Sequence, residues 1–166
     1  MQTIMITGCS SGFGLETARY FLEQGWKVIA TMRAPQEGVL PASDRLRLVR
    51  LDVTSAQSIA EAIAEAGEID VLVNNAGVGM LNALEGAPRE AIANLFATNT
   101  LGTIAMTQAV IPRFRERRSG TIVNITSAVT LQPMPLLAVY TASKAAVNAF
   151  TESLALELRA FNIRVG

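Results

Sequence analysis

A tyrosine and a lysine stand four residues apart near the end of the chain, at Tyr140 and Lys144. If this stretch is helical, the two side chains lie on one face, one turn apart. A phenol beside an ammonium can act as a general acid or base, because the positive charge favours the ionised phenol. The chain contains no histidine, the residue that most often does this work. The same pair on a solvated surface helix would contribute little to stability. The rest of the sequence has to distinguish a catalytic pair from an ordinary surface pair.

A glycine-rich turn follows the first apolar stretch of the chain. The segment TGCSSGFG places Gly8, Gly12 and Gly14 in the spacing G-x-x-x-G-x-G, between a predicted strand and a predicted helix. Gly8 permits a sharp turn, Gly12 lets backbone approach a pyrophosphate, and Gly14 permits close packing of helix on strand. Amide groups at the helix start would face the phosphates. An ordinary tight turn is the alternative. Cys9 lies inside this turn, where a small filler is a better explanation than a reactive thiol.

Short β-branched runs alternate along the chain with longer helical patterns. This alternation predicts an α/β fold, a doubly wound parallel sheet (Rossmann fold) in three α/β/α layers. Ligands of such sheets bind at the carboxyl ends of the strands, and every candidate residue falls at or just after such an end. Pro112 should bend or end the long third helix. Strands are predicted at 3–7, 27–32, 46–53, 69–76 and 120–126, with a sixth beginning at 162–166, and helices at 12–24, 55–66, 88–117 and 138–160.

Composition and charge exclude several classes of protein. Half of the residues are apolar, 17% are charged, and 14 basic residues balance 14 acidic ones. This balance argues against binding to nucleic acid or to an anionic membrane. The single cysteine and the absence of a signal peptide or a long apolar run predict a cytoplasmic protein, and we predict no metal site. The basic run at Arg113, Arg115, Arg117 and Arg118 is better explained by the helix dipole than by a phosphate site.

Four motifs occur together and in order. They are TGxxxGxG at Thr7–Gly14, NNAG at Asn74–Gly77, a serine at Ser127, and YxxxK at Tyr140–Lys144. In this combination the chain resembles the short-chain dehydrogenase/reductase family over essentially its whole length. The resemblance implies an enzyme that transfers a hydride between a nicotinamide cofactor and a carbonyl or alcohol substrate.

The resemblance also implies roles for individual residues. Tyr140 would be the general acid/base, Lys144 would favour its ionisation and bind the nicotinamide ribose, Ser127 would hold the substrate oxygen, and Asn99 would anchor a proton relay. Asn74 resembles part of the segment that lines the cofactor. The implied cofactor-binding residues are Gly8, Ser10, Ser11, Gly12, Phe13, Gly14, Arg33, Asp52, Val53, Asn75, Ala76, Gly77, Asn99, Tyr140 and Lys144.

Each of these residues also has an ordinary structural explanation. Ser127 could end a strand, Asn99 could mark a polar kink, and Asn74 and Asn75 could be turn residues. Asp52 with Thr54 could form a segment that caps a helix. The joint occurrence with the glycine turn favours the functional interpretation.

The end of the second predicted strand bears on the choice of cofactor. It reads Thr31-Met32-Arg33, with no acidic residue before Glu37. An acid at this point binds the ribose 2′-hydroxyl of NAD, whereas an arginine accommodates the 2′-phosphate of NADP. Arg33 therefore favours NADP, with NAD still possible. A solvated loop arginine is the alternative, and Ser10-Ser11 stands where some NADP-preferring members of the family carry a basic residue.

The segment between Ser127 and Tyr140 offers an apolar wall at Leu131, Met134, Leu136 and Leu137. It favours a small-molecule substrate that is a hydrophobic carbonyl or alcohol, such as a steroid, retinoid or acyl chain, although core packing explains part of the same pattern. The family continues beyond this point, so residues 1–166 are expected to be one dinucleotide-binding domain lacking the last strands and the substrate lid. The resemblance further implies a homodimer or homotetramer. The alternatives are a non-catalytic dinucleotide-binding module, serving as redox sensor or assembly partner, and a structural oligomer subunit.

Overall fold

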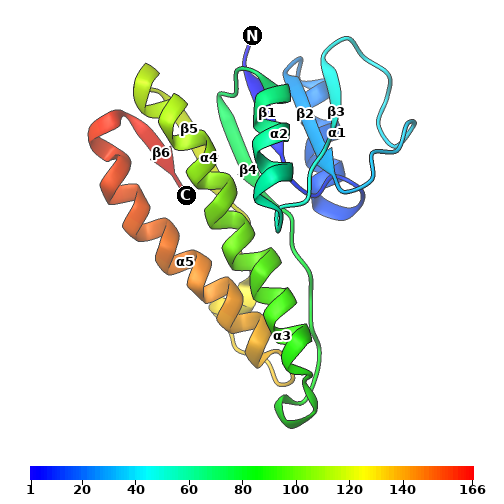
Figure 1. The fold of residues 1–166 in the computed structure, drawn as a ribbon, viewed down its shortest axis with the longest axis vertical. Coiled ribbons are helices and arrows are strands. Elements are labelled where there is room, and N and C mark those ends of the chain that lie inside the picture. The colour runs from blue at the N-terminus through cyan, green and yellow to red at the C-terminus, as the bar shows by residue number, and fades with distance from the viewer.

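The computed structural model describes all residues, 1–166, and contains one sheet of six parallel strands in the order β3-β2-β1-β4-β5-β6 (Figure 1). The order reverses between β1 and β4, which are neighbours in the sheet although 64 residues separate their ends in the chain. This arrangement confirms the predicted Rossmann fold. The strands are β1 (Thr3–Ile6), β2 (Lys27–Met32), β3 (Leu46–Arg50), β4 (Val71–Asn74), β5 (Gly120–Asn124) and β6 (Ile163–Val165).

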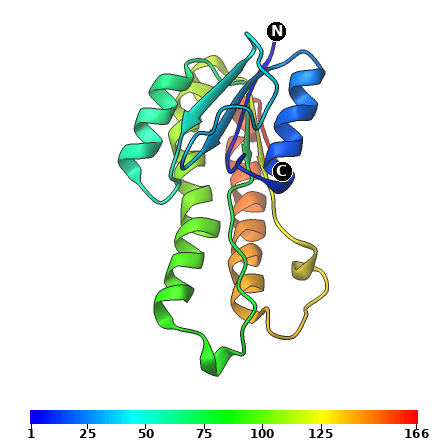
Figure 2. The ribbon, with the colours of Figure 1, turned by 90° about the vertical axis from the view of Figure 1, so that its right-hand side faces the viewer.

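Helices cover both faces of the sheet (Figure 2). Helix α1 (Gly12–Glu23) packs on one face, while α2 (Ala56–Ala66), α4 (Gly102–Arg117) and α5 (Ala138–Leu158) pack on the other. None of these helices combines the length and the apolar character needed to cross a lipid bilayer. The remaining elements are α3 (Arg89–Phe96), the π-helical segment η2 (Ala97–Leu101) and the short 3₁₀ turns η1 (Leu84–Gly86), η3 (Ala128–Thr130) and η4 (Arg159–Phe161).

The first strand shows why the apolar runs form a buried sheet. Ile4, Met5 and Ile6 are all fully buried, although successive side chains of a strand point to opposite faces. Met5 contributes to the core beneath α2, α4 and α5, whereas Ile4 and Ile6 contribute to the core beneath α1. A strand that is apolar at every position therefore requires a helical layer on each side.

The long predicted helix is interrupted at a different place from the one expected. The interruption is η2, whereas α4 continues through Pro112 to Arg117, so Pro112 does not end the helix. Proline lacks an amide hydrogen and leaves the carbonyl four residues earlier without its usual partner. That carbonyl belongs to Gln108, an exposed residue, so water can replace the missing bond.

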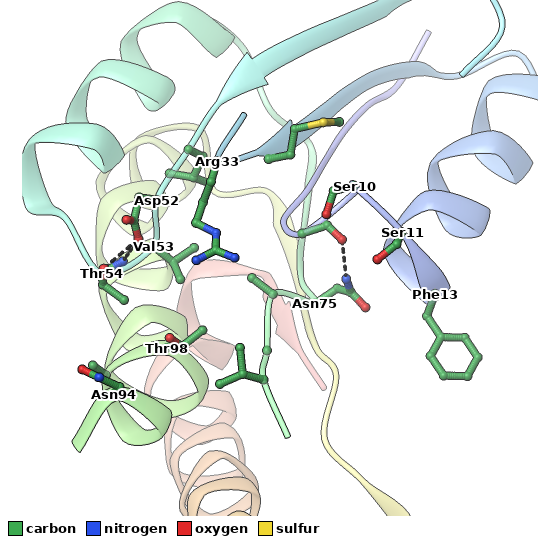
Figure 3. Close-up of a pocket in the computed structure, with 17 residues that line it drawn as sticks. Ser10, Ser11, Phe13, Arg33, Asp52, Val53, Thr54, Asn75, Asn94 and Thr98 are labelled. Carbon is green, nitrogen blue, oxygen red and sulfur yellow. Dashed lines mark hydrogen bonds between the residues drawn. The ribbon is translucent and has the colours of Figure 1, made fainter. Parts of the chain in front are cut away.

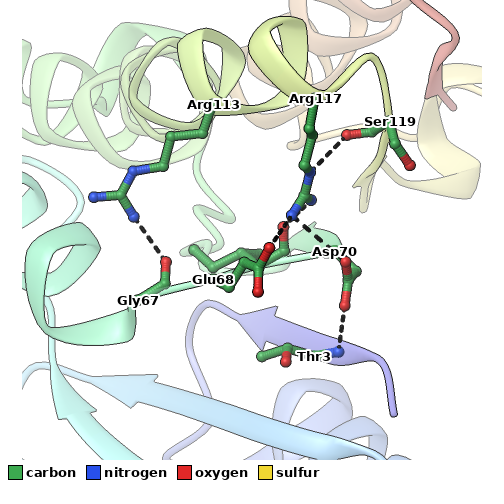
Figure 4. Close-up of polar contacts among 8 residues, drawn as sticks. Thr3, Gly67, Glu68, Asp70, Arg113, Arg117 and Ser119 are labelled. Carbon is green, nitrogen blue, oxygen red and sulfur yellow. Dashed lines mark hydrogen bonds and ion pairs between the residues drawn. The ribbon is translucent and has the colours of Figure 1, made fainter.

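The basic run at the end of α4 holds neighbouring segments together (Figure 4). The guanidinium of Arg113 donates to the Gly67 carbonyl at 2.7 Å, and that of Arg117 lies 3.5 Å from the Asp70 carboxylate. Asp70 in turn accepts a hydrogen bond of 2.8 Å from the amide of Thr3. These arginines are bound to backbone carbonyls and carboxylates at the end of the sheet opposite the carboxyl ends of its strands.

Candidate active site

A cavity of about 640 Å³ lies at the carboxyl ends of the strands, where the strand order reverses (Figure 3). Its walls come from the glycine turn, the ends of β2, β3 and β4, and the α3–η2 helix. The lining residues are Gly8, Ser10, Ser11, Phe13, Met32, Arg33, Leu51, Asp52, Val53, Thr54, Asn75, Ala76, Gly77, Val78, Asn94, Ala97 and Thr98.

The glycine turn is packed against the end of β4 so closely that side chains are excluded. Gly8 has a φ of +74°, and a Cβ atom built on it would lie 2.8 Å from Cα of Ala76. A Cβ on Gly14 would lie 2.3 Å from the Gly8 carbonyl oxygen and 2.4 Å from Nδ2 of Asn75. That same Asn75 amide donates to the carbonyl oxygens of Thr7 at 2.9 Å and Gly8 at 3.2 Å. Gly14 therefore has the packing role expected of it and does not line the cavity.

The start of α1 borders the cavity through Ser11 and Phe13. Ser11 is the N-cap residue, but its side chain makes no hydrogen bond to the first turn. Unpaired amides at a helix N-terminus favour an anion. Gly12, in that first turn, is not among the lining residues, and nothing lies within 4 Å of a Cβ built on it. The narrow turn, the open helix start and the cavity beyond it fit an elongated phosphate-containing ligand such as a dinucleotide.

The far end of the cavity carries charged groups in the segments that follow β2 and β3. Arg33 is exposed and its guanidinium extends into the cavity, towards the side that carries Asp52 (Figure 3). Oδ1 of Asp52 accepts hydrogen bonds from the hydroxyl and the amide of Thr54, at 2.7 and 2.9 Å. These two bonds hold the pKa of the Asp52 carboxyl below its usual value, with smaller contributions from the charges of Arg33 and Arg50. Asp52 thus both stabilises a local turn and lines the cavity.

Asn99 lies at the centre of the η2 interruption and is fully buried. Its Oδ1 accepts a hydrogen bond from the amide of Val78 at 2.8 Å, and its Nδ2 donates to the Val78 carbonyl at 2.9 Å. A third bond of 3.2 Å runs from Nδ2 to the hydroxyl of Ser143 on α5. Asn99 therefore joins the segment after β4 to the helix that carries Tyr140 and Lys144.

Lys144 is 5% exposed and has no carboxylate partner. Its Nζ donates a hydrogen bond of 2.8 Å to the Ile125 carbonyl, just beyond β5. A Cβ atom built on Gly77 would lie 3.5 Å from this Nζ and 3.3 Å from Oδ1 of Asn99, so three predicted site residues meet here. Burial lowers the pKa of the Lys144 ammonium. An ammonium retained at that cost is a candidate for function.

Tyr140 and Ser127 complete the predicted catalytic set from two different elements. Tyr140 is half-buried in the first turn of α5, one turn before Lys144. Ser127 is the N-cap residue of η3, where its hydroxyl oxygen accepts a hydrogen bond of 3.4 Å from the Val129 amide. The hydroxyl proton of Ser127 thus stays available for another acceptor. Like Asn99 and Lys144, both residues lie outside the lining of the cavity, which reaches this group at Gly77 and Val78.

Asn74 does not lie where the sequence placed it. Its side chain is buried beneath the site and donates to Oγ1 of Thr107 at 3.0 Å and to Oδ1 of Asn124 at 2.9 Å. It therefore fixes β4 against α4 and β5 and does not line the cavity. The side-chain amide of Asn124 continues the network, because its Nδ2 donates to the hydroxyl of Thr151 on α5 at 2.8 Å.

Sequence reasoning missed part of the cavity wall. Asn94 and Thr98 stand four residues apart and approach the cavity from one face of the α3–η2 helix. Their spacing, just before Asn99, is the signal that could have identified them. The other missed residues adjoin predicted ones and are Met32, Leu51, Thr54, Val78 and Ala97.

Comparison with known proteins agrees with this geometry. The family model described as short chain dehydrogenase matches residues 2–166. The chain belongs to the short-chain dehydrogenase family. A relative named 3-ketodihydrosphingosine reductase, from Bacteroides thetaiotaomicron, is 42% identical over 99% of this chain and 61% of its own length. The chain thus spans about 60% of the length of this curated relative.

Solved structures of family members have the same fold. A closed form of serine dehydrogenase complexed with NADP⁺ is 35% identical, with a TM-score of 0.92 over 99% of this chain and 69% of that one. A 3-ketoacyl-(acyl-carrier-protein) reductase from Brucella melitensis, complexed with NADH, is 31% identical, with a TM-score of 0.92 over 99% of this chain and 72% of that one.

Proposed function

We propose that this chain is the dinucleotide-binding and catalytic part of an oxidoreductase that interconverts a carbonyl and an alcohol with NADP(H). The observation that carries the proposal is the position of Lys144. Its buried ammonium lacks a carboxylate and lies against Gly77 and Asn99, where the cavity beside the glycine turn ends. Tyr140 stands one turn earlier on the same face of α5.

The residues of the chain supply proton chemistry, and the nicotinamide, when bound, supplies or accepts the hydride. The Tyr140 hydroxyl gives its proton to the carbonyl oxygen in reduction and receives it in oxidation. The Lys144 ammonium, held by the Ile125 carbonyl, favours the ionised phenol. The Ser127 hydroxyl, whose oxygen already accepts from Val129, donates to the same substrate oxygen. Asn99 keeps the segment after β4 next to Lys144.

NADP(H) is the proposed cofactor because of Arg33. Its guanidinium is planar and permanently charged, and it extends into the end of the cavity formed by β2 and β3. A 2′-phosphate there would form charge-assisted hydrogen bonds with it. The bound NADP⁺ of the serine dehydrogenase structure supports this choice, while the NADH of the ketoacyl reductase structure shows that the family uses both cofactors.

We further propose an apolar substrate. The loop between η3 and α5 exposes Leu131, Met134 and Leu136, at 87%, 57% and 51% of their surfaces. This loop is joined to the segment after β4 by a 3.0 Å hydrogen bond from the Asn82 amide to the Leu136 carbonyl. Exposed apolar side chains next to a reactive group favour binding of an apolar molecule. The relative named for 3-ketodihydrosphingosine supports a long-chain substrate.

The central test compares Tyr140→Phe with the parent enzyme in NADPH oxidation with a panel of long-chain and cyclic ketones. Loss of the acid should lower kcat by about 10²- to 10⁴-fold. The Kd of NADPH should change little, because the aromatic ring is kept. Equal substrate-dependent rates in the two proteins would overturn the assignment of the proton donor.

The cofactor assignment is tested by titrating NADPH and NADH into Arg33→Ala and Arg33→Lys. Removal of the guanidinium should weaken NADPH binding by about tenfold or more and leave NADH binding unchanged. Lysine keeps the charge but not the planar pair of donors, so the NADPH affinity of Arg33→Lys should lie between those of the parent and of Arg33→Ala. A parent protein that binds both dinucleotides equally, or an equal loss for both in Arg33→Ala, would remove Arg33 from the site.

A further inference from the structure

A chain of two hydrogen bonds connects helix α5 to the turn that carries Ser127. Nδ2 of Asn148 donates to the hydroxyl oxygen of Thr130 at 3.0 Å, and this hydroxyl donates to the carbonyl oxygen of Ser127 at 2.8 Å. We propose that Asn148 is a positioning residue that holds Ser127 in place through Thr130. The proposal rests on the function proposed above, in which Ser127 binds the substrate oxygen.

Asn148 continues a stripe of functional residues along α5. Tyr140, Lys144 and Asn148 are spaced by four, so they follow one face of the helix turn by turn. Lys144 binds the Ile125 carbonyl and Asn148 binds Thr130, so α5 holds the segment after β5 at two points. Ser127 lies between these two points. The helix that carries the acid/base residue therefore also determines where the serine stands.

The local structure around Ser127 needs this support. Two bonds from Thr130 converge on the Ser127 carbonyl, one from the hydroxyl at 2.8 Å and one from the amide at 3.1 Å. The next six residues, 131–136, are all exposed and so provide no packing of their own. Thr130 therefore provides the last side-chain hydrogen bond to this turn before the exposed stretch begins.

The direction of the hydrogen bonds gives Asn148 a specific effect. A threonine hydroxyl has one proton, and the amide of Asn148 donates to its oxygen. The hydroxyl proton is consequently directed to the Ser127 carbonyl. Each bond polarises the next, so loss of the Asn148 amide weakens the hold of Thr130 on Ser127. A small displacement of the Ser127 hydroxyl from the substrate oxygen is enough to slow the reaction.

The test uses Asn148→Leu, which keeps the approximate size and removes the donor, and the matched pair Thr130→Val and Thr130→Ser. We expect Asn148→Leu and Thr130→Val to lower kcat/KM for the ketone by about 5- to 30-fold. Thr130→Ser keeps the hydroxyl and should retain the parent rate. The Kd of NADPH should stay within about twofold in all three, because none of these residues lines the dinucleotide cavity.

A double-mutant cycle separates positioning of Ser127 from general damage. In a Ser127→Ala enzyme the serine hydroxyl is gone, so adding Asn148→Leu should change turnover less than about twofold. The same loss in both backgrounds, or no loss in the parent background, would overturn the inference while leaving the proposed function intact. A Ser127→Ala enzyme with full turnover would overturn the role of Ser127 itself, and the inference with it.

Hydrogen exchange provides a measurement that does not depend on turnover. The amides of Thr130 and Leu131 form the η3 turn with the carbonyls of Ser127 and Ala128. They should exchange faster in Asn148→Leu and in Thr130→Val, whereas the amides of β5 should be unchanged. Unchanged exchange in the peptide that covers residues 126–132 would show that Asn148 does not hold this turn, and would overturn the inference.

Discussion

At the scale of a single residue, Lys144 combines a positive charge with burial, and these two properties oppose each other. Its ammonium is almost completely buried, and burial lowers its pKa because the charged form loses its hydration. One carbonyl, that of Ile125, is its hydrogen-bond partner. A stabilising lysine would be paired with a carboxylate or exposed to water. The position of Lys144 therefore costs folding stability, and the function proposed above accounts for this cost because the ammonium would favour ionisation of the Tyr140 phenol.

Lys144→Met should abolish turnover and raise the melting temperature at pH 7. The unfolded chain binds the lysine proton more tightly than the folded protein, so the penalty is present in full below the folded pKa. It disappears as the pH rises towards the ordinary lysine value of 10.5. The difference in melting temperature should therefore shrink in alkaline buffers. A variant less stable than the parent at pH 7 would show that the ammonium stabilises the fold.

Cys9 illustrates the opposite case, a potentially reactive group made inert by its surroundings. It is fully buried in the glycine turn, and burial raises the pKa of its thiol to about 12. Compared with the reference value of 9.0, the thiolate fraction at pH 8 falls on the order of a thousandfold. Alkylation by iodoacetamide should be very slow in the folded protein and fast in urea. Rapid alkylation without denaturant would contradict the role of a small filler.

At the scale of elements, the site depends on two breaks in regular structure. The glycine turn ends β1 and locks onto the end of β4 through Asn75, so that α1 begins directly over the cavity. The π-helical segment η2 interrupts the α3–α4 helix at Asn99, whose side chain then reaches Val78 and Ser143. A continuous helix would carry Asn99 in a different direction. Such breaks are concentrated at functional sites because they reorient side chains.

Gly14→Ala should therefore damage both folding and dinucleotide binding. The added methyl group would lie 2.3 Å from the Gly8 carbonyl oxygen, so the turn and α1 have to separate. We expect a loss of about 1–3 kcal/mol in the free energy of unfolding, measured with urea, and a weaker Kd for NADPH. Gly79→Ala is the control for stability, because nothing lies within 4 Å of its added methyl group. Equal urea midpoints of unfolding for the two variants would show that the turn can open without loss of folding stability.

At the scale of the whole molecule, the site is assembled from distant parts of the chain. The cavity is lined by residues between Gly8 and Thr98, while Ser127, Tyr140 and Lys144 come from the last third of the sequence. The strand order places the ends of β1 and β4 side by side, with β5 next to β4. A bound dinucleotide would contact both halves of the sheet and stabilise only the folded arrangement. Assembly into a homodimer or homotetramer and a cytoplasmic location stay predictions.

NADPH should consequently raise the melting temperature of the protein as a whole. At a concentration of one hundred times Kd, a ligand that binds only the folded state adds about 2.7 kcal/mol. For a chain of this length this corresponds to roughly 5–11 °C. Differential scanning fluorimetry over a range of NADPH concentrations measures the shift. A melting temperature that does not change with NADPH would contradict a preformed dinucleotide site.

The sequence by itself determined the order and type of the elements, because apolar runs and glycine positions are local signals. It indicated the residues that meet near Gly77, since family motifs preserve spacing along the chain. Only the tertiary structure decided that Pro112 is tolerated, that Asn74 lies beneath the site, and that Asn94 and Thr98 line it. It also joined Asn148 to Ser127 through Thr130. These features depend on which side chains face one another across separate elements, and periodicity along a chain carries no record of that.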